Sequence, residues 1–214
     1  MYVRDYMSVD VITVSSDASV IQVQQLMDEH RLHRLPVVDE GRLVGIITRA
    51  RLRSVMPSPA STLDRWEMRS LLDQMTVETA MESEVIFVQP ETTVAETLML
   101  MKEHQIGSFP VVEAGKLVGI FTLTDILTIL ADILAAPREG CYLHFKPVGR
   151  RLLEEVVHAV SQAGLGIHSA FTITPPRTGE QELVVRLDTE EADEVVAELR
   201  ARGYEVERSC WEVC

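Results

Sequence analysis

The chain has 214 residues, of which 46% are apolar and 33 are acidic against 20 that are basic, so its formal net charge is −13. This length suffices for one or two domains with buried cores. The negative charge disfavours nucleic-acid binding, because a phosphate backbone would be repelled. The start lacks a signal-peptide pattern and no apolar run approaches the roughly 18 residues of a membrane helix, so we expect a cytoplasmic protein without a membrane partner.

An internal repeat without gaps occupies the first part of the chain. Residues 7–52, the first copy, recur as residues 81–126, the second copy, with a constant shift of 74. The sequence PVVDEGRLVGIIT of residues 36–48 returns as PVVEAGKLVGIFT at residues 110–122. Each copy is one supersecondary unit that buries its apolar face against the other. Two such units related by a pseudo-two-fold axis leave clefts between them, and clefts are common small-molecule sites.

Each copy is expected to form a strand, a helix, two strands and a second helix. The β-rich runs 11–14 and 85–88 predict the first strands, and Ser19 and Thr93 stand at the N-cap positions of the helices that follow. A strand that begins near a proline then leads through a turn into another strand, which predicts a hairpin with glycine at a positive φ. The two expected turns are Glu40-Gly41 and Ala114-Gly115.

Two breaks divide the chain. Residues 57–60 predict a linker, after which Ser61 and Asp64 would cap a short helix. The second break is Pro137 to Gly140. The expected domains are therefore residues 1–60, 61–136 and 141–214.

The patterns after the second break predict a split ferredoxin-like domain. Its expected order is βαββαβ, in which glycines follow both helices. The expected elements are a strand at 141–145, a helix at 150–163, strands at 167–174 and 183–187, a helix at 190–202 and a strand at 204–211.

Metal binding and catalysis find little support in the sequence. The odd count of three cysteines argues against a closed disulfide framework and fits a reducing compartment. Cys210 and Cys214 lack the paired spacing and the further ligands of a zinc site, so no metal is expected. No G-x-S-x-G, P-loop or G-x-G-x-x-G string occurs, and we expect a protein that is not an enzyme.

The two copies resemble a tandem pair of CBS domains, because PVV followed by G-x-LVGI-x-T occurs twice in the right order and spacing. The C-terminal part resembles an ACT domain in its element order and in the loop Pro147-Val148-Gly149 that enters a helix. This arrangement is similar to the acetoin-utilisation regulatory subfamily of bacteria. The resemblance implies an α/β and α+β fold, with two βαββα repeats followed by a ferredoxin-like ACT-like domain.

CBS pairs commonly bind adenosine compounds, and the resemblance implies a ribose motif in which aspartate follows threonine or serine by three residues. The second copy has this motif in Thr122, Thr124 and Asp125, whose carboxylate can accept hydrogen bonds from the vicinal hydroxyls. The first copy has Arg51 instead, which offers only donors, so one intact site is expected. The same motif is also typical of a helix N-cap with its capping box, an alternative that the sequence leaves open.

The complementary half of this site is expected on the first copy. His33 and Arg34 precede Leu35-Pro36 and resemble the IHRLP stretch with which the gamma subunit of AMP-activated protein kinase contacts phosphate. Guanidinium is well suited to phosphate, although a solvated helix end is the alternative interpretation. By the same resemblance the base would lie at Asp10, Val11 and Ile12.

The resemblance therefore implies a cytoplasmic regulatory protein that senses an adenine nucleotide, AMP, ADP or ATP, without an obligatory cofactor. S-adenosylmethionine and NAD are the alternative ligands. A homodimer and a regulated enzyme partner are expected. The rival interpretation is a structural or partner-docking module whose clefts are empty.

Overall fold

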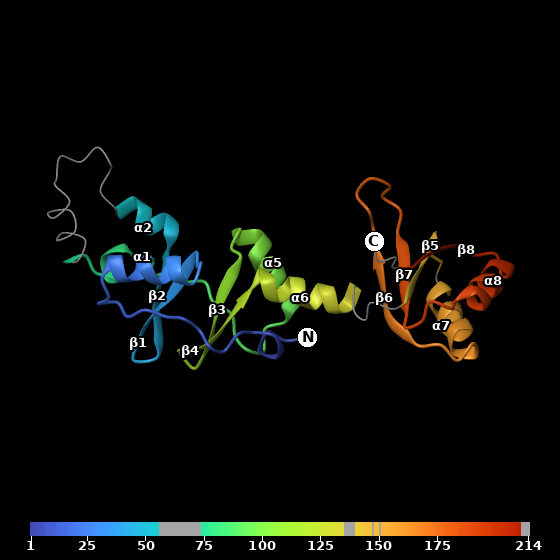
Figure 1. Cartoon of the computed structure of the whole chain (residues 1–214), viewed down its shortest axis with the longest axis horizontal. Helices are drawn as coiled ribbons and strands as arrows, with labels where there is room; N and C mark the ends of the chain where they lie inside the picture. The colour runs from blue at the N-terminus through green and yellow to red at the C-terminus, as the bar shows by residue number, and fades with distance from the viewer. Residues whose placement is uncertain (56–73, 135–139, 147, 150, 211–214) are drawn as a thin grey trace. The chain divides into compact units, whose positions relative to one another are not determined.

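The computed structural model describes residues 1–55, 74–134, 140–146, 148–149 and 151–210 (Figure 1). The chain divides into two compact units, Met1–Ile126 and Leu127–Cys214. Within the described ranges, no helix has both the length and the apolar character needed to cross a membrane. The predicted linker at 57–60, the short helix after it, residues 137–139 of the second break, Pro147 and Cys214 lie outside the described residues.

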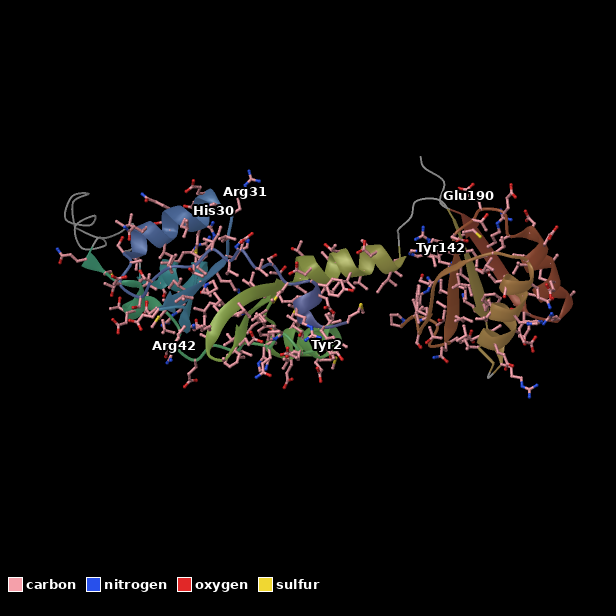
Figure 2. The ribbon with its side chains drawn as sticks, turned by 90° about the horizontal axis from the view of Figure 1, so that it is seen from below. Tyr2, His30, Arg31, Arg42, Tyr142 and Glu190 are labelled. Atoms are coloured by element: carbon pink, nitrogen blue, oxygen red, sulfur yellow. The ribbon has the colours of Figure 1, made fainter. Side chains whose placement is uncertain are left out.

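The first unit contains one antiparallel sheet to which each copy contributes a hairpin, with the strand order β1-β2-β4-β3 (Figure 1). The hairpins meet at Arg42, labelled in Figure 2, which pairs with Lys116. The elements are η1 Val3–Asp5, α1 Val20–Glu29, β1 Arg34–Asp39, β2 Arg42–Thr48, α2 Arg49–Val55, α4 Val77–Ala80, α5 Val94–His104, β3 Ser108–Glu113 and β4 Lys116–Thr122, followed by α6 Leu123–Leu134, which begins in this unit and continues past Ile126.

Both predicted hairpins are confirmed, and both turn through two residues with positive φ. The φ values are 50° at Glu40 and 80° at Gly41, and 48° at Ala114 and 80° at Gly115. Two central residues of this kind form a type I′ turn, whose twist matches that of the flanking strands. The turns therefore fix the same strand register in the two copies.

The strands predicted at residues 11–14 and 85–88 were wrong, because each run forms only one parallel bridge. Val14 pairs with Val37, and Val88 pairs with Val111. The reason is that each run crosses from one copy to the other: Ser8 pairs with Ile120 of the second copy, six residues before Val14 reaches the first. We call residues 7–14 and 81–88 the two leading segments. A segment that changes partners within a few residues cannot form a continuous ladder.

Each leading segment lies close against the other copy's hairpin at a glycine. A Cβ atom on Gly119 would lie 2.6 Å from the Met7 sulfur and 3.1 Å from the Ser8 carbonyl oxygen. A Cβ atom on Gly45 would likewise overlap the Met81 side chain. The glycine in each LVG string therefore makes room for the leading segment of the other copy.

The predicted helix N-caps are also observed. The Thr93 hydroxyl accepts from the backbone N–H of Glu96 at 3.2 Å, and the Glu96 carboxylate accepts from the Thr93 N–H at 3.0 Å and from its hydroxyl at 2.7 Å. These bonds lower the pKa of Glu96, with the backbone bond the larger cause. Ser19 and Gln22 form the same box at α1.

The second unit has the predicted βαββαβ order, and its antiparallel sheet has the ferredoxin-like strand order β6-β7-β5-β8. Both helices pack on one face of the sheet, in a core that includes Leu143, Val156, Val185 and Leu199. The elements are β5 Cys141–Lys146, α7 Leu152–Gln162, β6 Ile167–Ile173, β7 Glu182–Leu187, α8 Asp193–Ala201 and β8 Glu205–Cys210.

Polar and charged side chains stand among apolar ones on the other face of this sheet. The Arg186 guanidinium lies 5.4 Å from the ring centroid of Tyr142, which Figure 2 labels. The Lys146 ammonium lies 2.7 Å from a carboxylate oxygen of Glu182, and this bond raises the pKa of Lys146. Charge pairing and cation–π contact therefore satisfy cations that alternate with the apolar core residues of β5 and β7.

Replacing Gly119 by alanine should destabilise the first unit by about 1–3 kcal/mol, because the new methyl overlaps Met7 and the Ser8 carbonyl. Thermal unfolding followed by circular dichroism measures the change. Gly149→Ala is the control, since a Cβ there meets nothing within 4 Å. In the double variant Met7→Ala/Gly119→Ala, the loss of stability should be smaller than the sum of the losses in the two single variants. A loss equal to that sum would contradict the contact.

Thr93→Ala should raise the pKa of Glu96 part of the way to its ordinary value, because the hydroxyl donor is lost while the backbone donor remains. Since the folded-state pKa is the lower one, ionised Glu96 stabilises α5 above the unfolded-state pKa, and this contribution disappears as the pH falls through the folded-state pKa. Carboxyl-detected NMR titration measures the shift. Thr92→Ala is the control, and an unchanged Glu96 pKa in Thr93→Ala would refute the assignment.

Candidate functional site

A hollow of about 220 Å³ lies between the two copies in the first unit and is open to solvent. This volume is smaller than the roughly 300–1,000 Å³ of typical small-molecule sites. Apolar side chains form much of its wall, and charged groups of both signs stand among them. The lining residues are Arg34, Ile46 and Thr48 of the first hairpin, Glu82, Glu84, Val85 and Ile86 of the second leading segment, and Ile106 and Ser108 before and at the start of β3.

Strand pairing explains why these residues meet. Arg34 and Thr48 are register partners at the end of the first hairpin, and Ile46 pairs with Glu82 of the second leading segment. The same strand end is joined to the following helix, because the Arg49 N–H donates to the His33 carbonyl at 2.9 Å. The hairpin end and the crossing segment thus form adjoining walls.

The repeat relates this hollow to the predicted site. A shift of 74 residues converts its nine lining positions into a matching set on the other side of the pseudo-two-fold axis. Five of the eight predicted residues belong to that set, namely Asp10, Val11, Ile12, Arg34 and Thr122. Arg34 also lines the hollow itself. The full matching set is Ser8, Asp10, Val11, Ile12, Leu32, Arg34, Ser108, Ile120 and Thr122.

Thr122 and Asp125 form a capping box at the start of α6, so the capping alternative is confirmed as one role of the motif. Asp125 Oδ2 accepts from the Thr122 N–H at 2.6 Å and from its hydroxyl at 2.8 Å, and Thr122 Oγ1 accepts from the Asp125 N–H at 3.4 Å. Asp125 Oδ1 takes part in none of these three bonds. Thr124 lies exposed in the first turn of the same helix.

Arg51, at the position that matches Asp125, makes different contacts. Its backbone N–H donates to the Thr48 hydroxyl at 3.2 Å, which caps α2. Its side chain reaches the second copy's chain, where Nε lies 3.4 Å from the Ala80 carbonyl oxygen and 3.8 Å from Glu82 Oε1. Arg51 therefore ties α2 to the segment that leads into the second copy.

Arg34 is partly buried at the hollow, whereas His33 beside it is exposed. Burial lowers the pKa of Arg34, and the nearby Glu82 carboxylate acts in the opposite direction. Glu82 thus acts on Arg34 and is ion-paired with Arg51. The chemistry available here is anion binding by Arg34, hydrogen bonding by Thr48 and Ser108, and apolar contact with the isoleucines.

The predicted site did not include the cleft residues Thr48, Glu82, Glu84 and Ser108, because Arg51 stands in the first copy where the ribose motif has aspartate. The signal was present in the repeat. Thr48 is the counterpart of the predicted Thr122, and Glu84 is the counterpart of the predicted Asp10.

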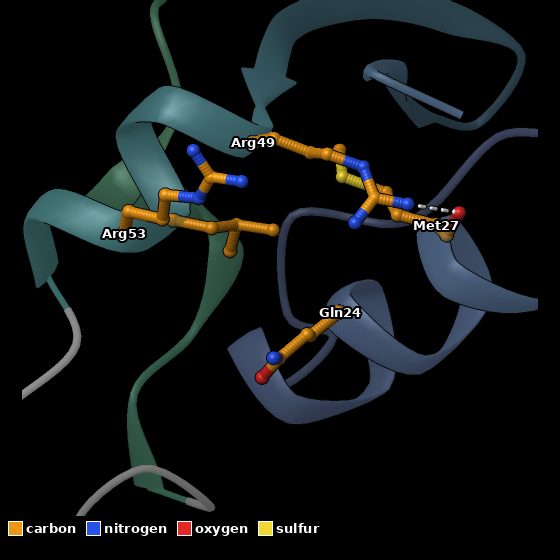
Figure 3. A pocket seen from close by; sticks show the side chains of 5 residues that line it. Gln24, Met27, Arg49 and Arg53 are labelled. Atoms are coloured by element: carbon orange, nitrogen blue, oxygen red, sulfur yellow. Dashed lines mark hydrogen bonds between the residues drawn. The ribbon is translucent and has the colours of Figure 1, made fainter. Parts of the chain in front are cut away.

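A second hollow, of about 60 Å³, lies within the first copy between α1 and α2 (Figure 3). Arg49 crosses it and donates to the Leu32 and Met27 carbonyl oxygens, each at 2.6 Å, and to the Asp28 carboxylate. These carbonyls follow or end α1, where backbone acceptors lack helical partners and a cation is favoured. Arg49 therefore has a structural role, holding the end of α1 next to His33 and Arg34. His30 and Arg31 lie at this helix end in Figure 2.

The fold and the hollow together define a tandem pair of intertwined repeats, each with a helix, a hairpin and a second helix, and a cleft between them. The CBS domain family matches residues 3–58 and 77–132, more than half of the chain. The chain belongs to the CBS domain family.

Relatives with known sequences share the repeats. A CBS domain-containing protein of Dictyostelium discoideum is 30% identical over 134 residues, which are 62% of this chain and 92% of that protein. An inosine-5′-monophosphate dehydrogenase of Korarchaeum cryptofilum is 39% identical over 118 residues, which are 55% of this chain. The match spans only 22% of that enzyme.

Solved structures share the fold. A Vibrio cholerae protein named for acetoin utilization, AcuB, is 27% identical, with a TM-score of 0.53 over 63% of this chain and 93% of that chain. The protein CBSX2, crystallised in complex with AMP, is 25% identical, with a TM-score of 0.51 over 62% of this chain and 97% of that chain.

Proposed function

We propose that this protein is a regulatory sensor of an adenine nucleotide, AMP, ADP or ATP, that binds between its two CBS copies. The observation that carries the proposal is the hollow between the copies, which is lined by Arg34, one of the eight residues predicted for the ligand. The similar structure of CBSX2 in complex with AMP supports this choice of ligand. S-adenosylmethionine and NAD are the competing ligands to be tested beside the nucleotides.

The proposed contacts follow the chemistry of the residues. Asp125 accepts hydrogen bonds from the ribose hydroxyls through Oδ1, with Thr122 and Thr124 beside it. His33 and Arg34 contact the phosphate as donors. The base lies against Asp10, Val11 and Ile12 of the first leading segment.

The regulatory part of the proposal uses the crossing segments. A ligand changes the arrangement of the two copies only if it binds one arrangement more tightly than another. Because each leading segment is held by both copies, a ligand that touches it acts on both. In this proposal the C-terminal unit, which has the element order of an ACT domain, carries the change to a regulated enzyme in the cytoplasm, and the chain itself catalyses no reaction.

We also propose that the protein is a homodimer. Four leucines form an exposed stripe along α6, at spacings of three and four residues. Their exposed fractions are 48% for Leu123, 65% for Leu127, 43% for Leu130 and 38% for Leu134. Leu98 and Met99 of α5 are exposed as well. Apolar stripes of this kind are buried when helices pair.

Asp125→Asn should weaken AMP binding about 10- to 100-fold, because charge-assisted hydrogen bonds to the ribose contribute about 1.5–3 kcal/mol. Asparagine keeps an acceptor for the Thr122 N–H, so the helix cap survives. Isothermal titration measures the affinity. Asp132→Asn, two turns further along α6, is the control and should bind as the wild type does.

The two parts of the proposal fail separately. Wild-type affinity in Asp125→Asn removes the residue assignment and leaves the sensor. If isothermal titration detects no binding heat with AMP, ADP, ATP, S-adenosylmethionine or NAD at millimolar concentration, the sensor proposal is wrong and a docking module is favoured.

Leu127→Lys/Leu130→Lys should convert the dimer to a monomer, because two buried ammonium groups would face an apolar partner. Size-exclusion chromatography with light scattering measures the mass. Asp132→Lys, which places one lysine on the opposite face of α6, should stay dimeric. A monomeric wild type, or a double variant that still dimerises, would contradict the assignment of this stripe.

A further inference from the structure

We propose that Glu82 and Glu84 limit the number of phosphates that the site accepts, so that the protein prefers AMP to ATP. This inference rests on the proposed function and deepens it. It starts from Arg34, which is the predicted phosphate contact and also lines the hollow beside the two glutamates.

The shared position of Arg34 sets the direction in which a phosphate chain would extend. A nucleotide whose ribose lies at Thr122 and Asp125 brings its first phosphate to Arg34. Further phosphates then enter the hollow, whose wall contains Glu82 and Glu84 of the second leading segment. Both glutamates are exposed to the solvent that fills this space.

The two sides of the pseudo-two-fold axis differ in charge. The positions that match Glu82 and Glu84 are Ser8 and Asp10, so the first leading segment has one carboxylate where the second has two. The hollow side is therefore the more acidic of the two walls. The repeat alone would have made them equal.

The arginines at the hollow do not provide a surplus of positive charge. Glu82 lies 3.8 Å from Arg51 and also acts on Arg34. Arg34 and Arg51 together match the formal charges of Glu82 and Glu84. One phosphate at Arg34 gains a charge-assisted contact, but each further phosphate adds negative charge near Glu84 and near Glu82, whose carboxylate is already paired with Arg51. The side chains of Glu82 and Arg51 are 51% and 48% exposed, so the repulsion is screened and moderate.

The test is the ratio of AMP to ATP affinity, measured by isothermal titration with EDTA present and repeated with Mg²⁺. The wild type should bind AMP more tightly than ATP. In Glu82→Gln/Glu84→Gln, ATP affinity should rise about 3- to 20-fold, with AMP affinity changed less than about 3-fold, since each removed surface charge contributes a modest amount. Glu78→Gln removes one charge from the helix before the leading segment, outside the hollow lining, and should leave the ratio unchanged.

The outcomes separate this inference from the proposed function. If the wild type binds ATP as tightly as AMP, or if the double variant keeps the wild-type ratio, the glutamates do not select and the nucleotide sensor stands. Tight ATP binding that needs Mg²⁺ and is lost in the double variant also overturns the inference, because the carboxylates would then hold the metal. If no adenosine compound binds the folded wild type, both proposals fall.

Discussion

The close approach of each leading segment to the other copy's hairpin is the contact on which the first unit depends. Met7 lies over Gly119, and Met81 lies over Gly45, in each case where a side chain on the glycine would collide. Because the segments are exchanged, neither copy completes its own packing. Each copy therefore packs against a segment of the other, and the hairpins of both copies lie in one sheet.

The same exchange builds the candidate site. A segment that leaves one hairpin and reaches the other must cross the space between them, and its residues become a wall of that space. Glu82 to Ile86 form this wall on the side of the hollow. Two arginines of α2 stabilise the surroundings of this space. Arg49 donates to a carbonyl at the end of α1, and Arg51 donates to the Ala80 carbonyl, just before the second leading segment. The cleft is thus held by residues that also hold the fold.

Local patterns carried much of the fold. The two-residue turns, the N-caps at Ser19 and Thr93, and the βαββαβ order depend on neighbours in the sequence, and all were predicted. The runs at 11–14 and 85–88 were wrong as strands because β propensity does not reveal a change of pairing partner. At the site, the sequence left open whether Thr122 and Asp125 cap a helix or bind a ligand, and the structure shows the capping bonds.

The sequence alone determined that the chain contains two supersecondary units of the same kind, and at which positions their residues differ. It also determined which residue types are available for a ligand, because all of these follow from the order of residues. Tertiary structure decided which residues share a wall. It placed Arg34 in the same hollow as Glu82 and Glu84. It also showed that Arg51, which the sequence marked only as a missing carboxylate, forms an ion pair with Glu82 of the second copy. The reason is that a cleft between intertwined copies is formed by segments far apart in the sequence, whose meeting depends on packing across the pseudo-two-fold axis.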